Sequence, residues 1–193
     1  MLKVAITGNI GTGKTTVCKV FESLGVNVYY ADKEAKKFYT YPEIIRSVKD
    51  LFGESVFDTS SKLRAAVLAK LAFKDPERLK ALNAIIHPLV LEDFLKWSDR
   101  CAAEPYILYE SALLFESGFI RHFDLSILVT SPAELALSRV MERDNISKAD
   151  FLSRSENQLH EDEKKDRADY IIRNDESLAL IPQVIDIHNS IIS

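Results

Sequence analysis

A glycine-rich loop near the start of the chain constrains the fold more than any other feature. Residues 8–15 read Gly-Asn-Ile-Gly-Thr-Gly-Lys-Thr and match the pattern G-x-x-x-x-G-K-[ST] at every fixed position. The loop follows an apolar run, Leu2–Thr7, and precedes an amphipathic segment at 16–24, which is the strand–loop–helix setting this pattern requires. Glycine frees backbone N–H groups to gather around an anion, and the helix adds its positive N-terminal end. The sequence therefore predicts a phosphate-binding loop and a nucleotide ligand, with a ligand-free glycine turn as the alternative.

The side chains of this segment, called the phosphate loop below, have assignable chemistry. Lys14 is expected to reach the β- and γ-phosphates of a bound nucleotide, and the Thr15 hydroxyl is expected to bind Mg²⁺. A nucleoside triphosphate with Mg²⁺ is therefore the expected ligand. The residues expected to contact the nucleotide here are Gly11, Thr12, Gly13, Lys14, Thr15 and Thr16.

Four further short apolar runs predict the rest of the fold. They lie at 26–30, Tyr106–Glu110, Leu125–Thr130 and 170–172, and helical periodicity follows each of them. Strands that alternate with helices form a parallel sheet. We expect an α/β fold with a doubly wound, five-stranded parallel sheet. Gly25 should end the first helix, and Ser131 should cap the helix that begins at Pro132.

Two stretches of the chain are longer than a simple crossover between parallel strands requires. Residues 33–103 carry helical periodicity and no strand signal, whereas a crossover needs only about a dozen residues. We expect a helical lobe at 33–103, inserted into a nucleotide-binding core formed by 1–32 and 104–193. The lobe either packs only or also holds the second substrate. A second polar, helix-rich stretch at about 139–167 is expected to form a lid.

The composition and net charge of the chain argue against several classes of protein. The net charge is −4 with no basic block, which disfavours a nucleic-acid partner. The two cysteines suggest neither a disulfide framework nor a metal site and fit a reducing compartment. No apolar run approaches the roughly 20 residues that span a bilayer, and the N-terminus does not read as a signal peptide. We expect a cytoplasmic protein without a membrane partner; the oligomeric state stays open.

Acidic side chains follow two of the expected strands. Asp32 comes after the second strand and Glu110 ends the third, and ligands of open parallel sheets bind beyond the carboxyl ends of the strands. Asp32 could accept the proton of an attacking hydroxyl or orient Mg²⁺, or it could be a helix N-cap. Glu110 could hold Mg²⁺ through water. Glu116 could cap a helix or contact substrate.

Basic side chains supply the complementary charge. Arg139 and Arg143 lie four residues apart and share a helical face, where they could close over a transferring phosphoryl group. The charge run at 161–167 is expected to be a solvated surface. Arg64 either packs on an apolar helix or clamps an anionic substrate. His87 is either a packing residue or a ligand.

The motifs also narrow the type of nucleotide protein. The chain has no N-K-x-D motif for reading guanine, which argues against a GTPase, and it is short for a motor. A kinase for a small molecule or nucleotide remains, together with a nucleotide-dependent binding protein that transfers nothing.

Taken in order, these elements make the chain resemble the dephospho-coenzyme A kinase family from end to end. The matching elements are the loop at 7–16, Ala31-Asp32, Phe52-Gly53, Leu63-Arg64, Ile86-His87-Pro88, Leu113-Leu114-Phe115-Glu116, Arg139 with Arg143, Arg154 with Gln158, and Ala168-Asp169 with Asn174. The resemblance implies a fold of the P-loop kinase type, and transfer of the γ-phosphate of ATP to the ribose 3′-hydroxyl of dephospho-CoA. The alternative is another P-loop kinase.

The resemblance also implies roles for single residues. Asp32 would lie near the acceptor hydroxyl, Lys14 and Arg139 would stabilise the transferring phosphoryl group, and Arg143 would serve the lid or the nucleotide. Asn174 would lie near adenine. The inserted lobe would bind the CoA moiety, and the remaining substrate-side residues would be Arg64, His87 and Glu116.

The chain departs from the usual pattern of that family at several positions. The family usually has glycine where Asn9 stands, Asp where Tyr30 stands, Asp or Asn at Leu63, and Pro at Ala112. These departures concern the acceptor side and the phosphate loop, and they leave Lys14 unchanged.

Overall fold

The contacts of the chain divide it into two compact units. The computed structural model describes residues 1–193. One unit comprises Met1–Tyr30 and Ser98–Ser193, and the other comprises Ala31–Trp97; we call them the sheet unit and the helical unit. The helical unit begins and ends slightly earlier than the 33–103 lobe expected from the sequence. Asp32 therefore belongs to the helical unit.

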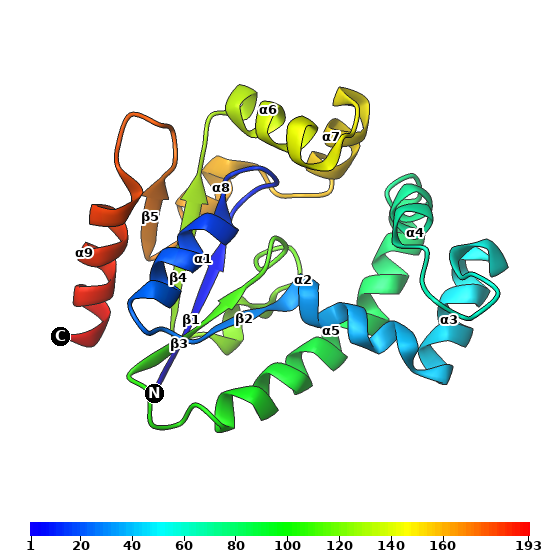
Figure 1. Ribbon diagram of the computed structural model, residues 1–193, viewed down its shortest axis with the longest axis horizontal. Coiled ribbons are helices and arrows are strands. Elements are labelled where there is room, and N and C mark those ends of the chain that lie inside the picture. The colour runs from blue at the N-terminus through cyan, green and yellow to red at the C-terminus, as the bar shows by residue number, and fades with distance from the viewer. The chain divides into compact units, whose positions relative to one another are not determined.

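The sheet unit is built on five parallel strands, so the predicted fold class is confirmed. The strands are β1 (Leu2–Thr7), β2 (Val28–Tyr30), β3 (Tyr106–Glu110), β4 (Leu125–Thr130) and β5 (Tyr170–Arg173), in the spatial order β2-β3-β1-β4-β5 (Figure 1). β2 begins two residues later than expected, because Val26 bonds back to Phe21 in the turn after the first helix. The chain passes to one side of β1 for β2 and to the other for β4, which opens a crevice at the carboxyl ends of the strands.

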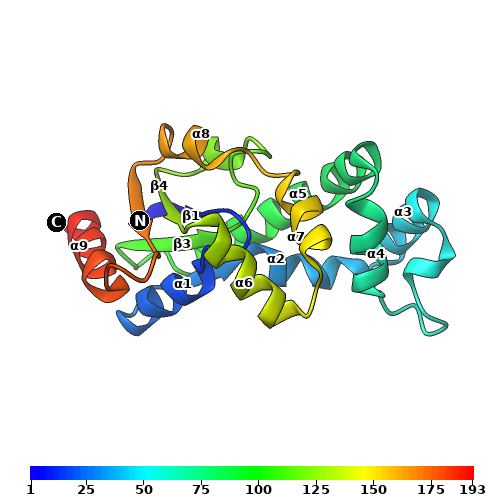
Figure 2. The ribbon, with the colours of Figure 1, turned by 90° about the horizontal axis from the view of Figure 1, so that it is seen from above.

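Helices cover both faces of this sheet. The helices of the sheet unit are α1 (Lys14–Ser23), α6 (Ala133–Asp144), α7 (Lys148–Ser155), α8 (Glu161–Lys165) and α9 (Leu180–Ile192), with a 3₁₀ turn at Phe119–His122. α1 and α9 lie on one face and α8 on the other, as the view in Figure 2 shows. The core between the sheet and the α1–α9 layer comprises Val4, Ile6, Val17, Cys18, Phe21, Val26, Tyr106, Leu108, Ile127, Val129, Ile172, Val184 and Ile187. This burial fixes where α1 begins, and so positions the phosphate loop.

The sequence predicted the end of α1 correctly and the start of α6 incorrectly. Gly25 follows the end of α1 with a φ of 88°, a left-handed conformation that favours glycine. Ser131 is not the N-cap of α6: Pro132 occupies that position, with φ −52° and ψ 138°, and no side chain caps the helix. The prediction for Ser131 was therefore wrong, because the extended backbone of Pro132 moves the helix start to Ala133.

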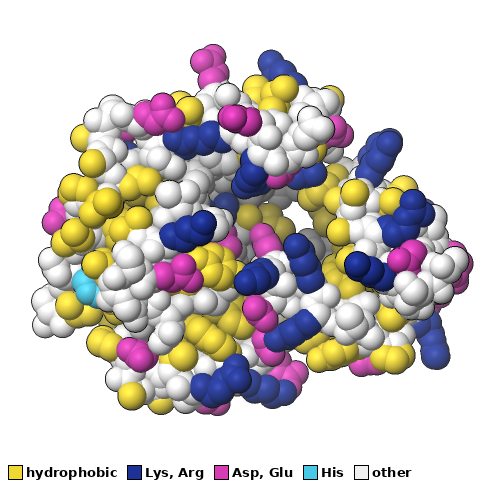
Figure 3. Space-filling view, in the orientation of Figure 1, with side chains coloured by type: hydrophobic (Ala, Val, Ile, Leu, Met, Phe, Trp, Pro, Cys, Tyr) yellow, Lys and Arg dark blue, Asp and Glu magenta, His cyan; other side chains and the backbone are white.

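α9 keeps part of its apolar surface in contact with solvent. Val184 and Ile187 pack into the core, whereas Ile181 is 59 % exposed. Hydrophobic side chains are visible at the left of Figure 3, over the region of α9. None of the helices combines the length and the apolar character that crossing a bilayer requires.

The helical unit contains helices and one isolated bridge. Its elements are α2 (Ala31–Glu34), a 3₁₀ segment (Ala35–Thr40), α3 (Pro42–Phe52), a 3₁₀ turn (Glu54–Val56), α4 (Ala65–Ala72) and α5 (Pro76–Asp99), whose last two residues belong to the sheet unit. The bridge pairs Phe57 with Leu63. The buried residues of this unit are Ala31, Phe38, Ile44, Val48, Phe52, Val56, Phe57, Leu68, Ala72, Leu82, Ile86, Val90 and Phe94. Their helical spacing explains why the sequence predicted helices here.

Candidate active site

The phosphate loop connects β1 to α1 and needs glycine at two crowded positions. Gly11 and Gly13 have φ values of 84° and 88°, a region that L side chains rarely adopt. A Cβ atom at Gly11 would collide with the backbone of Ala136, and one at Gly13 would collide with the side-chain amide of Asn174. The loop is therefore packed against α6 and the end of β5, and its shape depends on both.

The N-terminus of α1 is arranged as an anion site. Its N-cap is Gly13, no side chain caps the helix, and no acidic residue lies in its first turn. Thr15 and Thr16 are exposed there. Uncapped N–H groups and the positive end of the helix dipole favour a phosphate at this point. The loop contains the hydroxyl and amide groups that a triphosphate needs.

Lys14 lies folded over its own loop. Its Nζ donates to the carbonyl oxygen of Gly8 at 2.8 Å and to that of Asn9 at 3.3 Å. The Asn9 carbonyl also accepts from the Thr12 hydroxyl at 2.9 Å and the Thr12 N–H at 3.3 Å. The Asn9 carbonyl is thus the point where the loop closes on itself and where its lysine is held.

Glu110 lies on the α1 side of the sheet. It is 6 % exposed at the end of β3 and in register with Ile6 of β1, and Ile6 faces the core beneath α1. Burial raises the pKa of the Cys18 thiol, and the nearby Glu110 carboxylate raises it further. Cys18 is therefore an inert core thiol. The carboxylate of Glu110 and the hydroxyl of Thr15 are oxygen donors of the kind that Mg²⁺ prefers.

Arg139 and Asn174 come together at the end of β5. The Arg139 guanidinium donates to the Asn174 carbonyl at 3.2 Å, to the Asn174 side-chain oxygen at 3.5 Å and to Ser131 Oγ at 3.3 Å. It also pairs with Glu176 at 3.1 Å. Two residues given separate roles from the sequence thus form one cluster beside the phosphate loop.

Arg143 takes a different partner from Arg139, although both lie on α6. Its guanidinium makes two hydrogen bonds to Asp144, at 2.7 and 2.9 Å, and its side chain is 63 % exposed. Hydrogen bonding from Arg143, with help from Arg154, lowers the pKa of Asp144. Arg143 is thus a solvent-facing cation at the start of the expected lid.

The helical unit brings two of the predicted substrate-side residues near each other. Asp32 is exposed in the first turn of α2 and is not an N-cap. His87 is half-buried on α5; burial lowers its pKa, and the Asp32 carboxylate opposes that shift. Arg64 is the exposed N-cap residue of α4, and its guanidinium donates to the carbonyl of Ser55 at 3.2 Å. The Asp32 carboxylate therefore acts electrostatically on the pKa of His87.

The surroundings of Glu116 and Lys164 differ most from those expected from the sequence. Glu116 Oε1 lies 2.6 Å from Lys164 Nζ and accepts the N–H of Leu159 at 2.9 Å. The Lys164 side chain is completely buried, so the prediction of a solvated surface at 161–167 was wrong for this residue. Sequence reasoning missed Lys164, because nothing in the local pattern separates it from its exposed neighbours.

The comparisons with known proteins agree on one family. The family model of dephospho-CoA kinase matches residues 2–179. The dephospho-CoA kinase of Bacteroides fragilis is 40 % identical over 187 residues, which cover 96 % of this chain and 91 % of the relative. The crystal structure of TT1252 from Thermus thermophilus superposes with a TM-score of 0.85 at 34 % identity, covering 100 % and 98 % of the two chains. The structure of the dephospho-CoA kinase from Campylobacter jejuni superposes with a TM-score of 0.70 at 27 % sequence identity, and the match covers 98 % of this chain and 96 % of the other.

Proposed function

Because the chain belongs to the dephospho-CoA kinase family, we propose that it transfers the γ-phosphate of ATP to the ribose 3′-hydroxyl of dephospho-CoA. The products are CoA and ADP, and the reaction is the last step of coenzyme A biosynthesis. The observation that carries the proposal is the uncapped N-terminus of α1, with Lys14 and Thr15 in its first turn. This arrangement supports a bound triphosphate.

The proposed reaction breaks one bond and forms one. The acceptor oxygen attacks the γ-phosphorus, and the bond from that phosphorus to the β–γ bridging oxygen breaks, releasing ADP. The hydroxyl proton passes to the Asp32 carboxylate, which suits this role because it is exposed and acidic. Phosphoryl transfer leaves the protein mainly positioning and charge neutralisation.

The cationic side chains supply that neutralisation. We assign Lys14 and Arg139 to the transferring phosphoryl group and Arg143 to the nucleotide or the lid. To reach a phosphate, Lys14 exchanges its bonds to the carbonyls of Gly8 and Asn9, and Arg139 exchanges its bond to Glu176. Asn174 is assigned to the adenine side. We expect the 139–167 segment to close over ATP, because an open site would hydrolyse it.

Magnesium fits the donors of the sheet unit. The hydroxyl of Thr15 and, through water, the carboxylate of Glu110 would hold the ion, because both oxygens belong to elements that meet at the carboxyl end of the sheet. Bound Mg²⁺ would neutralise charge on the β- and γ-phosphates. Arg64, His87 and Glu116 are assigned to the acceptor side.

The experiment that tests the function measures ADP release with and without dephospho-CoA. We expect release that depends on dephospho-CoA and on Mg²⁺, with little release from ATP alone. A panel of other alcohol acceptors, including shikimate and deoxynucleosides, serves as the control for the alternative kinases. Equal turnover with those acceptors would contradict the assigned substrate, and ATP binding without any ADP release would contradict transfer.

A further inference from the structure

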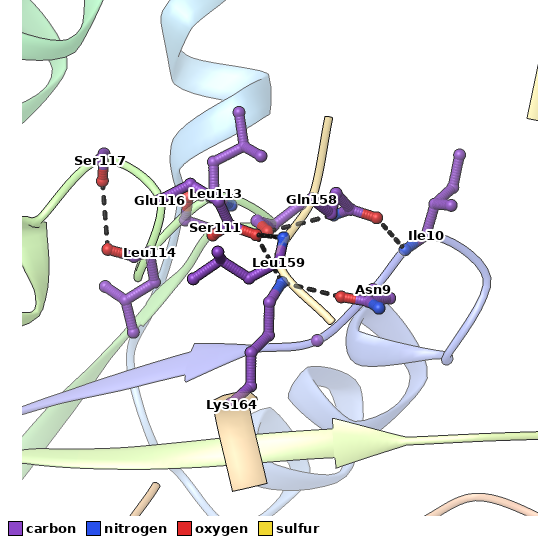
Figure 4. Close-up of polar contacts among 12 residues, drawn as sticks. Asn9, Ile10, Ser111, Leu113, Leu114, Glu116, Ser117, Gln158, Leu159 and Lys164 are labelled. Carbon is purple, nitrogen blue, oxygen red and sulfur yellow. Dashed lines mark hydrogen bonds and ion pairs between the residues drawn. The ribbon is translucent and has the colours of Figure 1, made fainter. Parts of the chain in front are cut away.

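A buried lysine outside the assigned catalytic groups is attached directly to the phosphate loop. Lys164 lies on α8 and its side chain is 0 % exposed. Its Nζ lies 2.6 Å from Glu116 Oε1 and donates to Asn9 Oδ1 at 2.7 Å. Figure 4 shows it reaching from α8 towards Asn9 and Glu116. A buried ammonium is costly unless it is paired and hydrogen-bonded, and these two acceptors meet that need.

Asn9 joins this lysine to the lysine of the loop. The side-chain oxygen of Asn9 accepts from Lys164, and its carbonyl oxygen accepts from Lys14 at 3.3 Å and from Thr12 Oγ1 at 2.9 Å. A glycine at position 9 would have no side chain for Lys164 to hold. The contact therefore depends on the asparagine of this chain.

The same part of the chain holds the loop at a second point. Gln158 Oε1 accepts the N–H of Ile10 at 2.8 Å, and Gln158 Nε2 donates to the carbonyl of Ala112 at 3.2 Å. Residues 158–164 therefore bind the phosphate loop at Asn9 and Ile10 and bind the segment after β3 at Ala112 and Glu116 (Figure 4). Two anchors on successive loop residues restrict how the loop can move.

We propose that Lys164 is a positioning residue that sets the phosphate loop for ATP through the side chain of Asn9. The lysine fixes Asn9, and Asn9 fixes the carbonyl that holds Lys14 and Thr12. A loop that is ordered before the nucleotide arrives loses less conformational entropy on binding, and it places Lys14 for transfer. The effect that passes through Asn9 concerns ATP and not the acceptor. This inference rests on the proposed function for its kinetic readout.

The test uses Asn9→Ala, Lys164→Met and the double variant. Asn9→Ala removes the contact while Lys164 keeps Glu116, so the fold retains its buried ion pair. We expect Asn9→Ala to lower kcat/KM for ATP about tenfold, the scale of one hydrogen bond to a charged group, with KM for dephospho-CoA unchanged. In the Asn9→Ala background, Lys164→Met should reduce kcat/KM for ATP by much less than it does alone, because the shared contact is already lost.

Lys19→Met is the control. Lys19 is exposed on α1 and lies outside both the phosphate loop and the 139–167 segment. We expect wild-type kinetics from Lys19→Met, whereas Lys164→Arg should recover part of the loss seen in Lys164→Met because it keeps the charge. Should Lys164→Met fail to fold, the Asn9→Ala measurement decides alone.

Three results would overturn the inference. The first is an unchanged kcat/KM for ATP in Asn9→Ala, and the second is an equal rise of the KM values for ATP and dephospho-CoA in that variant. The third is a double variant whose loss in kcat/KM for ATP equals the product of the losses in the two single variants. Calorimetric ATP affinity separates this inference from the proposed function, because it needs no acceptor. A wild-type protein that binds ATP but does not phosphorylate dephospho-CoA would contradict the function, and a weaker ATP affinity of Asn9→Ala would still support the positioning role.

Discussion

The side-chain amide of Asn174 donates a buried hydrogen bond to the main-chain oxygen of Thr12 at 2.8 Å. This contact joins the residue after β5 to the middle of the phosphate loop, although the two lie far apart in the sequence. The same amide is what a Cβ atom on Gly13 would strike. Asn174 therefore contacts the loop at Thr12, while Lys164 contacts it at Asn9.

Replacing Asn174 with alanine is expected to weaken both stability and ATP binding. The Thr12 carbonyl would lose its buried donor, which costs about 1–3 kcal/mol of unfolding free energy. Urea unfolding measures this loss, and KM for ATP should rise in parallel because the loop is less constrained. Asn189→Ala, at an exposed position of α9, is the control and should change stability by less than about 0.5 kcal/mol. Equal stabilities for the two variants would show that the bond contributes nothing.

Replacing Lys14 with alanine should abolish most of the activity and leave the fold intact. Its Nζ donates to the carbonyl oxygens of Gly8 and Asn9, and both of these contacts lie within its own loop, so they do not join distant parts of the fold. The expected fall in kcat is large; the nearest reference is the roughly 10³–10⁵-fold effect of an arginine finger. Lys19→Ala, on the exposed side of α1, should behave as wild type. Turnover near the wild-type rate in Lys14→Ala would remove this lysine from the mechanism.

Asp32→Asn separates proton transfer from nucleotide binding. The amide cannot accept the proton of the attacking hydroxyl, so kcat should fall while the calorimetric affinity for ATP stays the same. Glu34→Gln, which changes another acid of the same short helix, is the control. If Asp32→Asn abolished ATP binding instead, the residue would act as a structural or metal-binding group.

His87 should make the protein less stable in mild acid. Burial lowers its pKa below the usual 6.5, so the unfolded chain takes up a proton before the folded chain does. Its contribution to stability is complete above pH 6.5 and declines as the pH falls through that value towards the folded pKa. The free energy of unfolding, measured from pH 7 to pH 5, should fall less steeply in His87→Gln.

Asp32→Asn provides a control of opposite sign for this titration. The Asp32 carboxylate opposes the lowering of the His87 pKa. Its removal should therefore lower that pKa further and steepen the loss of stability in acid. An identical slope in the wild type, His87→Gln and Asp32→Asn would show that His87 titrates alike in the folded and unfolded chains.

Local patterns predicted the parts of the fold that local physics controls. Strands β1, β3 and β4 lie where short apolar runs indicated them, since strands buried on both faces must be apolar along their whole length. The phosphate loop was equally readable, because its backbone conformation demands glycine at fixed spacing. Ser131 was assigned wrongly because the φ that proline fixes, −52° at Pro132, fits both an N-cap and the first residue of a helix, so the local sequence does not distinguish the two positions.

The amino-acid sequence by itself determined the parallel sheet, the nucleotide-binding loop and the family, because each depends on residue types at short, fixed separations. Only the tertiary structure decided the partners of the charged side chains. It buried Lys164 against Asn9 and Glu116, and it turned Arg139 towards Asn174. A charge carries no local signal of its partner, since the cost of burying it is met by groups that the fold brings from distant parts of the chain.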